Sequence, residues 1–196
     1  MFIRTESPLT FVRSYPIVST IVAVHILAFL FATIPHPLAD RFLDTFVGFN
    51  AAIAEGEYWR LATSLFLHVQ FGHVVANSFS LLLFGPMLEK MIGKKLFLVT
   101  YIGSGILANV ATFCFAPIIY SHLGASGAIF GILGVYSYLA LFHRQLVNRE
   151  EARIIFSALV AGFAMTFTFP HMNTIAHLFG FFSGAILAPF VAVRLN

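Results

Sequence analysis

Two residues of this chain have side chains that could serve as a nucleophile and a base. Ser126 lies in the glycine-flanked turn Gly124-Ala125-Ser126-Gly127 at the start of an apolar stretch, and His177 lies inside another apolar stretch. Polar side chains at membrane depth are expensive and are usually functional. A serine hydroxyl beside an imidazole is an activated nucleophile. If the two side chains meet, they could hydrolyse peptide bonds inside a bilayer.

The composition indicates a polytopic membrane protein. Of the 196 residues, 59% are hydrophobic and only 10% are charged, and the mean hydropathy is +0.91. A soluble domain carries about 25% charged residues. The net charge is only +3, and the Lys and Arg residues lie between the apolar runs. This pattern fits membrane topology better than nucleic-acid binding. The single cysteine, Cys114, excludes an internal disulfide and a cysteine-cluster metal site.

Six apolar segments are long enough to cross a bilayer, which requires about 20 mostly apolar residues. They are residues 16–34, 70–91, 95–115, 125–143, 152–170 and 174–193. Prolines bound several of them, including Pro16 at the start of the first and Pro170 at the end of the fifth. The predicted fold is an all-α membrane protein, a compact bundle of six transmembrane helices that forms a single domain over residues 1–196.

The distribution of basic residues predicts the orientation of the bundle. Of the 11 Lys and Arg residues, all but two fall on one side of the six spans. That side holds Arg4, Arg13, Lys90, Lys94, Lys95, Arg144, Arg149, Arg153 and Arg194. Only Arg41 and Arg60 fall on the other side. The positive-inside rule therefore predicts that both termini are cytoplasmic.

Residues 35–69, which join the first two spans, are long for a connection in a helix bundle. The segment is mildly amphipathic, so we expect an extracytoplasmic first loop that rests partly in the membrane interface. The pair Trp59-Arg60 suits the level of the lipid headgroups. An ordinary ordered loop is the alternative. At the inner end of the second span, Glu89 and Lys90 are interpreted as topological anchors.

Four polar residues share one depth in this predicted topology. Ser126 begins the fourth span, His177 lies near the start of the sixth, and His73 and Asn77 lie within the first two turns of the second. All these helix starts are at the outer side of the membrane. His73 and Asn77 share a helix face because they are four residues apart. We therefore expect the four side chains to form one outward-facing site.

Glycine spacing predicts that the fourth and sixth spans touch. Small residues recur along one face of each helix, at Gly127, Gly131 and Gly134 in the fourth span and at Gly180 and Gly184 in the sixth. Small residues allow helix backbones to approach closely. His177 lies on the same face as the glycines of the sixth span. A tight contact would therefore place His177 beside Ser126.

Taken together, these motifs resemble the rhomboid intramembrane serine proteases, and closely resemble the bacterial GlpG type. The shared motifs are Trp59-Arg60, His73-x-x-x-Asn77, Gly124-x-Ser126-Gly127 and Ala176-His177-x-x-Gly180-x-x-x-Gly184. The six-span layout extends the resemblance to nearly the whole chain. A Gly-x-Ser-Gly turn alone is a weak signal, but the ordered set on the right spans is highly specific.

The resemblance implies an intramembrane serine endopeptidase that cuts peptide bonds in or near transmembrane segments of membrane-protein substrates. Ser126 would be the nucleophile and His177 the general base. His73, Asn77 and the backbone N–H of Ser126 would form the oxyanion hole, and Gly124 matches the glycine on the oxyanion side. We therefore expect a multi-pass protein of the bacterial inner membrane whose site faces the extracytoplasmic side. Its partners would be transmembrane substrates and membrane lipids.

The chain departs from the family pattern one turn after the serine. Many relatives have a tyrosine there that stacks on the histidine, and this chain has Phe130, which keeps the ring and lacks the hydroxyl. We assign supporting roles to Phe130, Gly127, Gly180 and Gly184. No Asp or Glu lies in the fourth or sixth span, which predicts a Ser-His dyad instead of a triad. No cofactor is expected.

Lateral access of a substrate is expected past the fifth span, residues 152–170. Beyond Arg153 at its start, this segment has no strongly polar residue and is rich in phenylalanine. A substrate helix could therefore reach the site from the lipid by displacing it.

Two other classes of protein remain as alternatives. A noncatalytic rhomboid-like protein that binds membrane helices would usually lack the serine or the histidine, and both are present here. A zinc or haem protein could use His68, His73 and His177, but no HExxH motif or membrane-buried carboxylate supports metal-assisted hydrolysis. We therefore expect no metal in the site.

Overall fold

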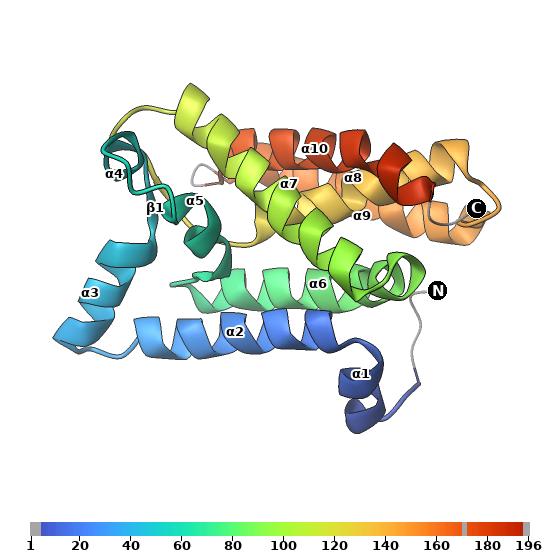
Figure 1. Cartoon of the computed structure of the whole chain (residues 1–196), viewed down its shortest axis with the longest axis horizontal. Coiled ribbons are helices and arrows are strands. Elements are labelled where there is room, and N and C mark those ends of the chain that lie inside the picture. Colours follow the sequence, from blue (N-terminus) through green and yellow to red (C-terminus); the bar gives the residue numbers. More distant parts are fainter. Residues whose placement is uncertain (1–4, 170–171, 194–196) are drawn as a thin grey trace.

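A computed structural model of the protein describes residues 5–169 and 172–193, which are almost entirely helical (Figure 1). The predicted spans correspond to α2 (Pro16–Ala32), α6 (Phe71–Ile92), α7 (Lys94–Phe115), α8 (Ser126–Phe142), α9 (Arg149–Thr168) and α10 (Thr174–Ala192). Pro170, which was expected to end the fifth span, lies outside the described residues, as do Arg4 and Arg194.

The helices form a bundle suited to a membrane. Helices α6, α7, α9 and α10 are each long and apolar enough to cross one, and α8 is a shorter apolar helix. Helix α1 (Pro8–Ser14) meets α2 at a bend of 111°, and the two together could make a further crossing. The predicted all-α membrane bundle is therefore confirmed. The number of crossings and the cytoplasmic side of the termini stay predictions.

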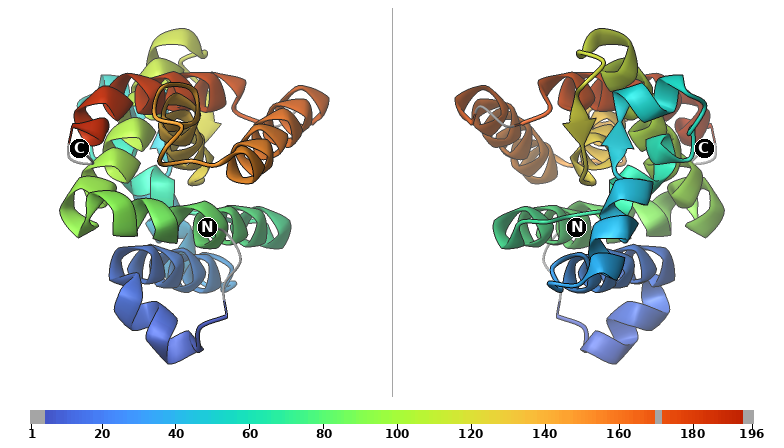
Figure 2. Two further views of the ribbon diagram at one scale, coloured as in Figure 1. Left: turned by 90° about the vertical axis from the view of Figure 1, so that its right-hand side faces the viewer. Right: turned by 90° about the vertical axis from the view of Figure 1, so that its left-hand side faces the viewer.

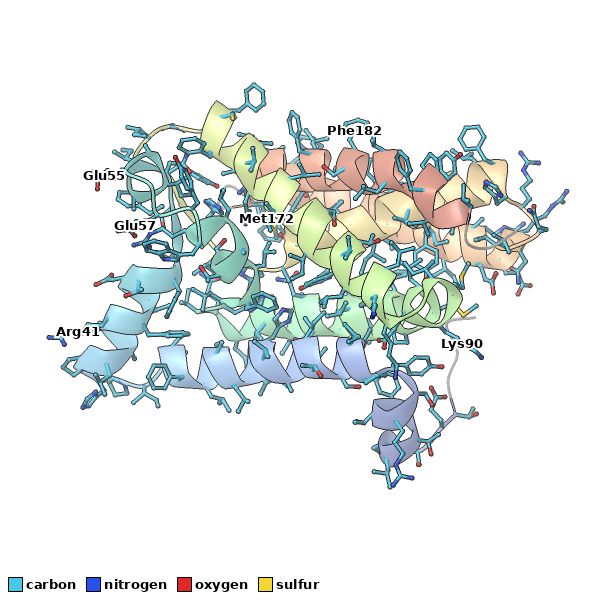
Figure 3. The ribbon with its side chains drawn as sticks, viewed as in Figure 1. Arg41, Glu55, Glu57, Lys90, Met172 and Phe182 are labelled. Atoms are coloured by element: carbon cyan, nitrogen blue, oxygen red, sulfur yellow. The ribbon has the colours of Figure 1, made fainter. Side chains whose placement is uncertain are left out.

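The charged side chains lie at the ends of the bundle. Arg41, Glu55 and Glu57 gather at one end, and Lys90 lies at the other (Figure 3). Helix α2 begins and α10 ends at the same end as Lys90 (Figure 1). This arrangement agrees with a bundle whose two ends face water and whose middle is apolar.

Helix α8 is the centre of the bundle. Ile132, Val135 and Tyr136 on this helix are fully buried, and it contacts α6, α7, α9 and α10. A buried hydroxyl needs a hydrogen-bond partner. The hydroxyl of Tyr136 finds one by donating to the carbonyl oxygen of Phe84 at 2.8 Å. The helix that begins with Ser126 is therefore held on all sides by its neighbours.

The predicted close contact between the fourth and sixth spans is confirmed. A Cβ atom at Gly180 would collide with the carbonyl oxygen of Gly127, and one at Gly184 would collide with that of Gly131. A Cβ at Gly134 would likewise collide with the backbone of α10. The two backbones therefore touch directly, as small residues allow.

Glu89 has a different role from the one expected. Its side chain is only 2% exposed, and its carboxylate accepts the backbone N–H groups of Ile17 at 3.0 Å and Val18 at 2.9 Å. These are orphan donors at the start of α2, where a negative charge also meets the positive end of the helix dipole. Glu89 is therefore an interhelical cap that joins α6 to α2, and the topological-anchor interpretation is wrong.

The first loop is ordered and consists of short elements. They are α3 (Pro37–Phe46), β1 (Gly48–Phe49), α4 (Asn50–Ala54), α5 (Arg60–Thr63) and the 3₁₀-helix η1 (Ser64–Phe66). Arg60 holds them together, because its guanidinium donates to the carbonyl oxygens of Asp44 at 2.7 Å and Val47 at 2.8 Å and pairs with Glu57. Arg60 is only 7% exposed. Its side chain therefore faces the loop interior, and the headgroup level expected for Trp59-Arg60 stays a prediction.

A short antiparallel pairing ties this loop to the segment before α8. Strand β1 pairs with β2 (Ser121–His122), with Gly48 opposite His122. A Cβ at Gly48 would lie 2.5 Å from Nε2 of His122, so the imidazole packs directly on the glycine backbone. The loop thereby positions the residues that lead into the Gly124 turn.

Helix α9 is packed less closely than the other spans. Viewed end-on, it stands at the edge of the bundle (Figure 2). A smaller share of its apolar residues is buried than in α6, α7 or α10. Its start is well defined, because Asn148 and Glu151 form a reciprocal capping box. The helix therefore has a defined start, but less of it is buried against its neighbours than of the other long spans.

The glycine contact can be tested by a single methyl group. Gly184→Ala should lower the free energy of unfolding by about 1–3 kcal/mol, because the methyl group would force the α8 and α10 backbones apart. Gly103→Ala in α7 is the matched control, since a Cβ there meets nothing within 4 Å. Gly103→Ala should be neutral or slightly stabilising. Thermal unfolding in detergent measures both, and equal effects would contradict the contact.

Candidate active site

Ser126 and His177 form a hydrogen-bonded pair. Ser126 Oγ lies 2.8 Å from His177 Nε2, although the residues are 51 positions apart in the chain. Ser126 is the first residue of α8, and His177 lies in the first turn of α10. Ser126 is partly exposed, whereas His177 is only 4% exposed. The glycine contact between the two helices therefore places the hydroxyl against the imidazole.

The other ring nitrogen of His177 has a partner that the sequence did not reveal. His177 Nδ1 lies 2.6 Å from Oγ1 of Thr166, a buried residue in the last turn of α9. The same hydroxyl lies 2.7 Å from the carbonyl oxygen of Gly162 and donates its only proton there. It can then only accept a hydrogen bond from His177. The proton of the neutral imidazole therefore resides on Nδ1, and Nε2 is left as the acceptor for Ser126.

An aromatic ring supports the imidazole from one side. The ring of Phe130 stacks on that of His177, with centroids 4.4 Å apart and planes 17° from parallel. The ring of Phe163 from α9 packs on Phe130 in turn, with centroids 4.8 Å apart. A Cβ at Gly162 would lie 2.9 Å from Cζ of Phe130. Phe130 is thus held between the imidazole and α9, which fits its expected supporting position.

His73 and Asn77 lie beside the turn that precedes Ser126. Gly124 has a φ of +114°, a conformation that favours glycine. A Cβ at Gly124 would lie 2.5 Å from Cε1 of His73 and 3.5 Å from Nδ2 of Asn77. The conformation and the space therefore both require glycine. The structure brings together all four polar residues that the sequence singled out.

A buried histidine outside the predicted set holds Asn77. His68 is fully buried, and its Nε2 lies 3.0 Å from Asn77 Nδ2. Burial, with a smaller contribution from the neighbouring His25 and His73, lowers the pKa of His68 to about 3. The imidazole is therefore neutral near pH 7, and its Nε2 accepts a hydrogen bond from the side-chain amide of Asn77. The second amide proton of Asn77 remains for another acceptor.

The serine turn is also fixed from the loop side. The backbone N–H of Gly124 donates to the carbonyl oxygen of Ser64 at 2.9 Å. Asn109 of α7 secures Ser64 by donating to its hydroxyl at 3.0 Å and to the carbonyl oxygen of Leu61 at 2.8 Å. The first loop, α7 and the Gly124 turn are thus one hydrogen-bonded unit that ends at Ser126.

The three histidines considered as possible metal ligands, which are His68, His73 and His177, make other contacts. His68 bonds Asn77, and His177 bonds Ser126 and Thr166. The rings of His68 and His73 pack edge to face with centroids 5.0 Å apart. Among the residues that the structure describes, no group of three His, Cys, Asp or Glu is arranged to hold a metal ion.

Comparisons with known proteins match most of the chain to one family. A family model described as the rhomboid domain matches residues 55–194. The putative rhomboid protease YdcA of Bacillus subtilis is 44% identical over 188 residues, which cover 96% of this chain and 94% of the relative. Rhomboid protease GluP of the same organism is 35% identical over 74% of this chain, but only 29% of GluP is covered.

A relative from Homo sapiens, named inactive rhomboid protein 2, is 33% identical over 67% of this chain and 15% of its own length. Family membership alone therefore does not establish activity. The family model and the long match to YdcA agree on the family, and each covers most of the chain. They do not distinguish the GlpG type within the family, which stays a prediction. This chain belongs to the rhomboid family.

Proposed function

We propose that this protein is an intramembrane serine endopeptidase that uses a Ser-His dyad on transmembrane protein substrates. The observation that carries the proposal is the 2.8 Å contact of Ser126 Oγ with His177 Nε2 at the start of α8. Rhomboid proteases among the relatives support a hydrolase. The site would face the extracytoplasmic side of a bacterial inner membrane, where water can enter it.

The proposed reaction proceeds through an acyl-enzyme. Ser126 Oγ attacks the scissile carbonyl carbon while its proton passes to His177 Nε2. The imidazolium then returns this proton to the leaving amine, and the peptide bond breaks. Water next attacks the ester, again giving its proton to His177 Nε2. The protonated imidazole reprotonates Ser126 Oγ and releases the acid. No carboxylate is needed to balance these steps.

Three donors support a proposed oxyanion site. As the first residue of α8, Ser126 has a backbone N–H that the helix itself does not use, and the helix dipole adds positive charge there. Asn77 keeps one amide proton after bonding His68. The His73 ring lies against Gly124, two residues before the nucleophile. These three groups are proposed to stabilise together the negative charge that would develop on the scissile carbonyl oxygen.

Thr166 is proposed to orient the base in place of the acidic residue of a triad. Its hydroxyl fixes the proton of His177 on Nδ1, which leaves Nε2 free to take the proton of Ser126. In serine proteases with a triad, the aspartate performs this orienting task. Unlike an aspartate, the neutral Thr166 hydroxyl orients the imidazole ring but adds no negative charge that would stabilise the imidazolium.

A noncatalytic role in binding membrane helices is the alternative. One human relative is named inactive rhomboid protein 2, and this match is the observation that supports the alternative. The close pairing of Ser126 with His177 favours catalysis, because helix binding alone needs neither side chain.

Substitution of the proposed nucleophile and substitution of one oxyanion donor should affect cleavage to different extents. Ser126→Ala should abolish cleavage of a transmembrane reporter by purified protein. Asn77→Ala should only lower kcat, by about 10²–10³-fold, because one of three donors is lost. A fluorophosphonate should label Ser126 and fail to label the His177→Ala variant. Full cleavage by Ser126→Ala would rule out the mechanism, and absence of both cleavage and labelling in the native chain would favour the helix-binding alternative.

Thr166 can be tested with two substitutions of similar size. Thr166→Val keeps the shape and removes the hydroxyl, and it should lower kcat by roughly 3- to 10-fold with little change in KM. Thr166→Ser keeps the hydroxyl and should restore most of the rate. Nitrogen chemical shifts of the His177 ring should show Nδ1 protonated in the native chain and a mixture in Thr166→Val. Equal rates for the two variants would contradict the orienting role.

Access past α9 is also a proposal, supported by the loose packing of that helix. A cross-link between α9 and α6 should stop cleavage of a transmembrane reporter. Labelling of Ser126 by a small fluorophosphonate should continue, because the reagent can enter from water. Unchanged reporter cleavage by the cross-linked protein would exclude this route.

A further inference from the structure

A second site lies at the opposite end of α9 from Thr166. A cleft of about 1040 Å³ runs along the side of α9, between this helix and the end of α8. Its lining includes Arg144, Arg149 and Arg153 at one end and Phe156 and Val160 at the other. None of these residues takes part in the proposed chemistry. The cleft therefore needs an explanation of its own.

The arginines of this cleft have no ion-pair partner among the residues that the structure describes. Within residues 5–169 and 172–193, no ion pair joins Arg144, Arg149 or Arg153 to a carboxylate. Glu151, the nearest buried carboxylate along the chain, is engaged in the capping box with Asn148. Glu150 and Glu151 follow Arg149 but do not line the cleft, so three guanidinium groups border one concave surface and the local charge favours an anionic occupant. Arginine is especially suited to phosphate, which it binds through two parallel N–H groups.

The lining also changes in character along the helix. Arg149 is the first residue of α9, and Val160 follows 11 residues later. At a rise of about 1.5 Å per residue, these positions are roughly 16 Å apart along the axis. The cleft is therefore basic where the helix emerges from the apolar region and apolar toward the middle of the bundle. A molecule that fills it needs an anionic head and a hydrocarbon tail.

We propose that this cleft binds one anionic phospholipid, with the phosphate at Arg144, Arg149 and Arg153 and an acyl chain along Phe156 and Val160. The predicted orientation places the arginines at the cytoplasmic leaflet, where anionic lipids attract basic groups. A free phosphate would leave the apolar half empty, and a zwitterionic lipid would gain less from three positive charges. The proposal rests on the bundle and its charges, and does not require that the protein be a protease.

Native mass spectrometry of the full chain in neutral detergent tests the proposal. Phosphatidylglycerol and phosphatidylcholine with identical acyl chains are the two probes. The native protein should retain one phosphatidylglycerol and release phosphatidylcholine. The triple variant Arg144→Gln/Arg149→Gln/Arg153→Gln should bind phosphatidylglycerol on the order of 100-fold more weakly. Added inorganic phosphate should not displace the bound lipid.

The matched control removes the same charge at the same end of the bundle. Arg13→Gln/Lys90→Gln/Lys94→Gln should retain phosphatidylglycerol, because none of these residues lines the cleft. Val160→Trp would fill the apolar half and should weaken lipid binding with all three arginines intact. Circular dichroism verifies that each variant is folded.

Three results would overturn the proposal. The first is equal retention of phosphatidylglycerol and phosphatidylcholine. The second is an equal loss of phosphatidylglycerol binding in the arginine variant and its control. The third is a dimer that depends on the arginines, which would assign the cleft to a second copy of the chain. Failure of Ser126 to react with a fluorophosphonate would leave the lipid result unaffected, so this proposal and the proposed protease activity fail separately.

Discussion

Direct backbone contact between α8 and α10 is the constraint on which the site depends. Gly180 and Gly184 present no side chain, so the carbonyl oxygens of Gly127 and Gly131 lie directly against them. Membrane helices gain little from burying apolar surface in one another, and close van der Waals packing takes its place. This packing sets the separation of the two helix starts. A 2.8 Å hydrogen bond between Ser126 and His177 follows from it without any covalent or ionic link.

The site combines a rigid half with a looser half. On the rigid side, the Gly124 turn is bonded to Ser64, and Asn109 secures Ser64 to α7. On the looser side, α9 lies at the edge of the bundle and reaches the site through Thr166 and the ring of Phe163. The turn before Ser126 is therefore fixed by several interactions, whereas the orientation of the His177 ring depends in part on one weakly packed helix.

Most of the fold could be predicted because apolar length and glycine spacing are local properties of the sequence. The span boundaries, the α8–α10 contact and the grouping of Ser126, His177, His73 and Asn77 follow from such patterns. Thr166 could not be found this way, since a threonine in an apolar helix usually bonds its own backbone, and Thr166 also does so. The role of Glu89 depends on residues 71 and 72 positions away, which no local pattern reveals.

The placement of Thr166 on α9 makes the protonation geometry of the base conditional on where that helix stands. A hydrogen bond of 2.6 Å is lost when its partners separate by about 1 Å, so even a small outward movement of α9 would release the imidazole ring. The state that admits a substrate from the lipid would then hold the His177 ring less well oriented, and return of the helix would restore its orientation. The Thr166 hydroxyl would thereby couple the closed position of α9 around a substrate to the correct orientation of the His177 ring.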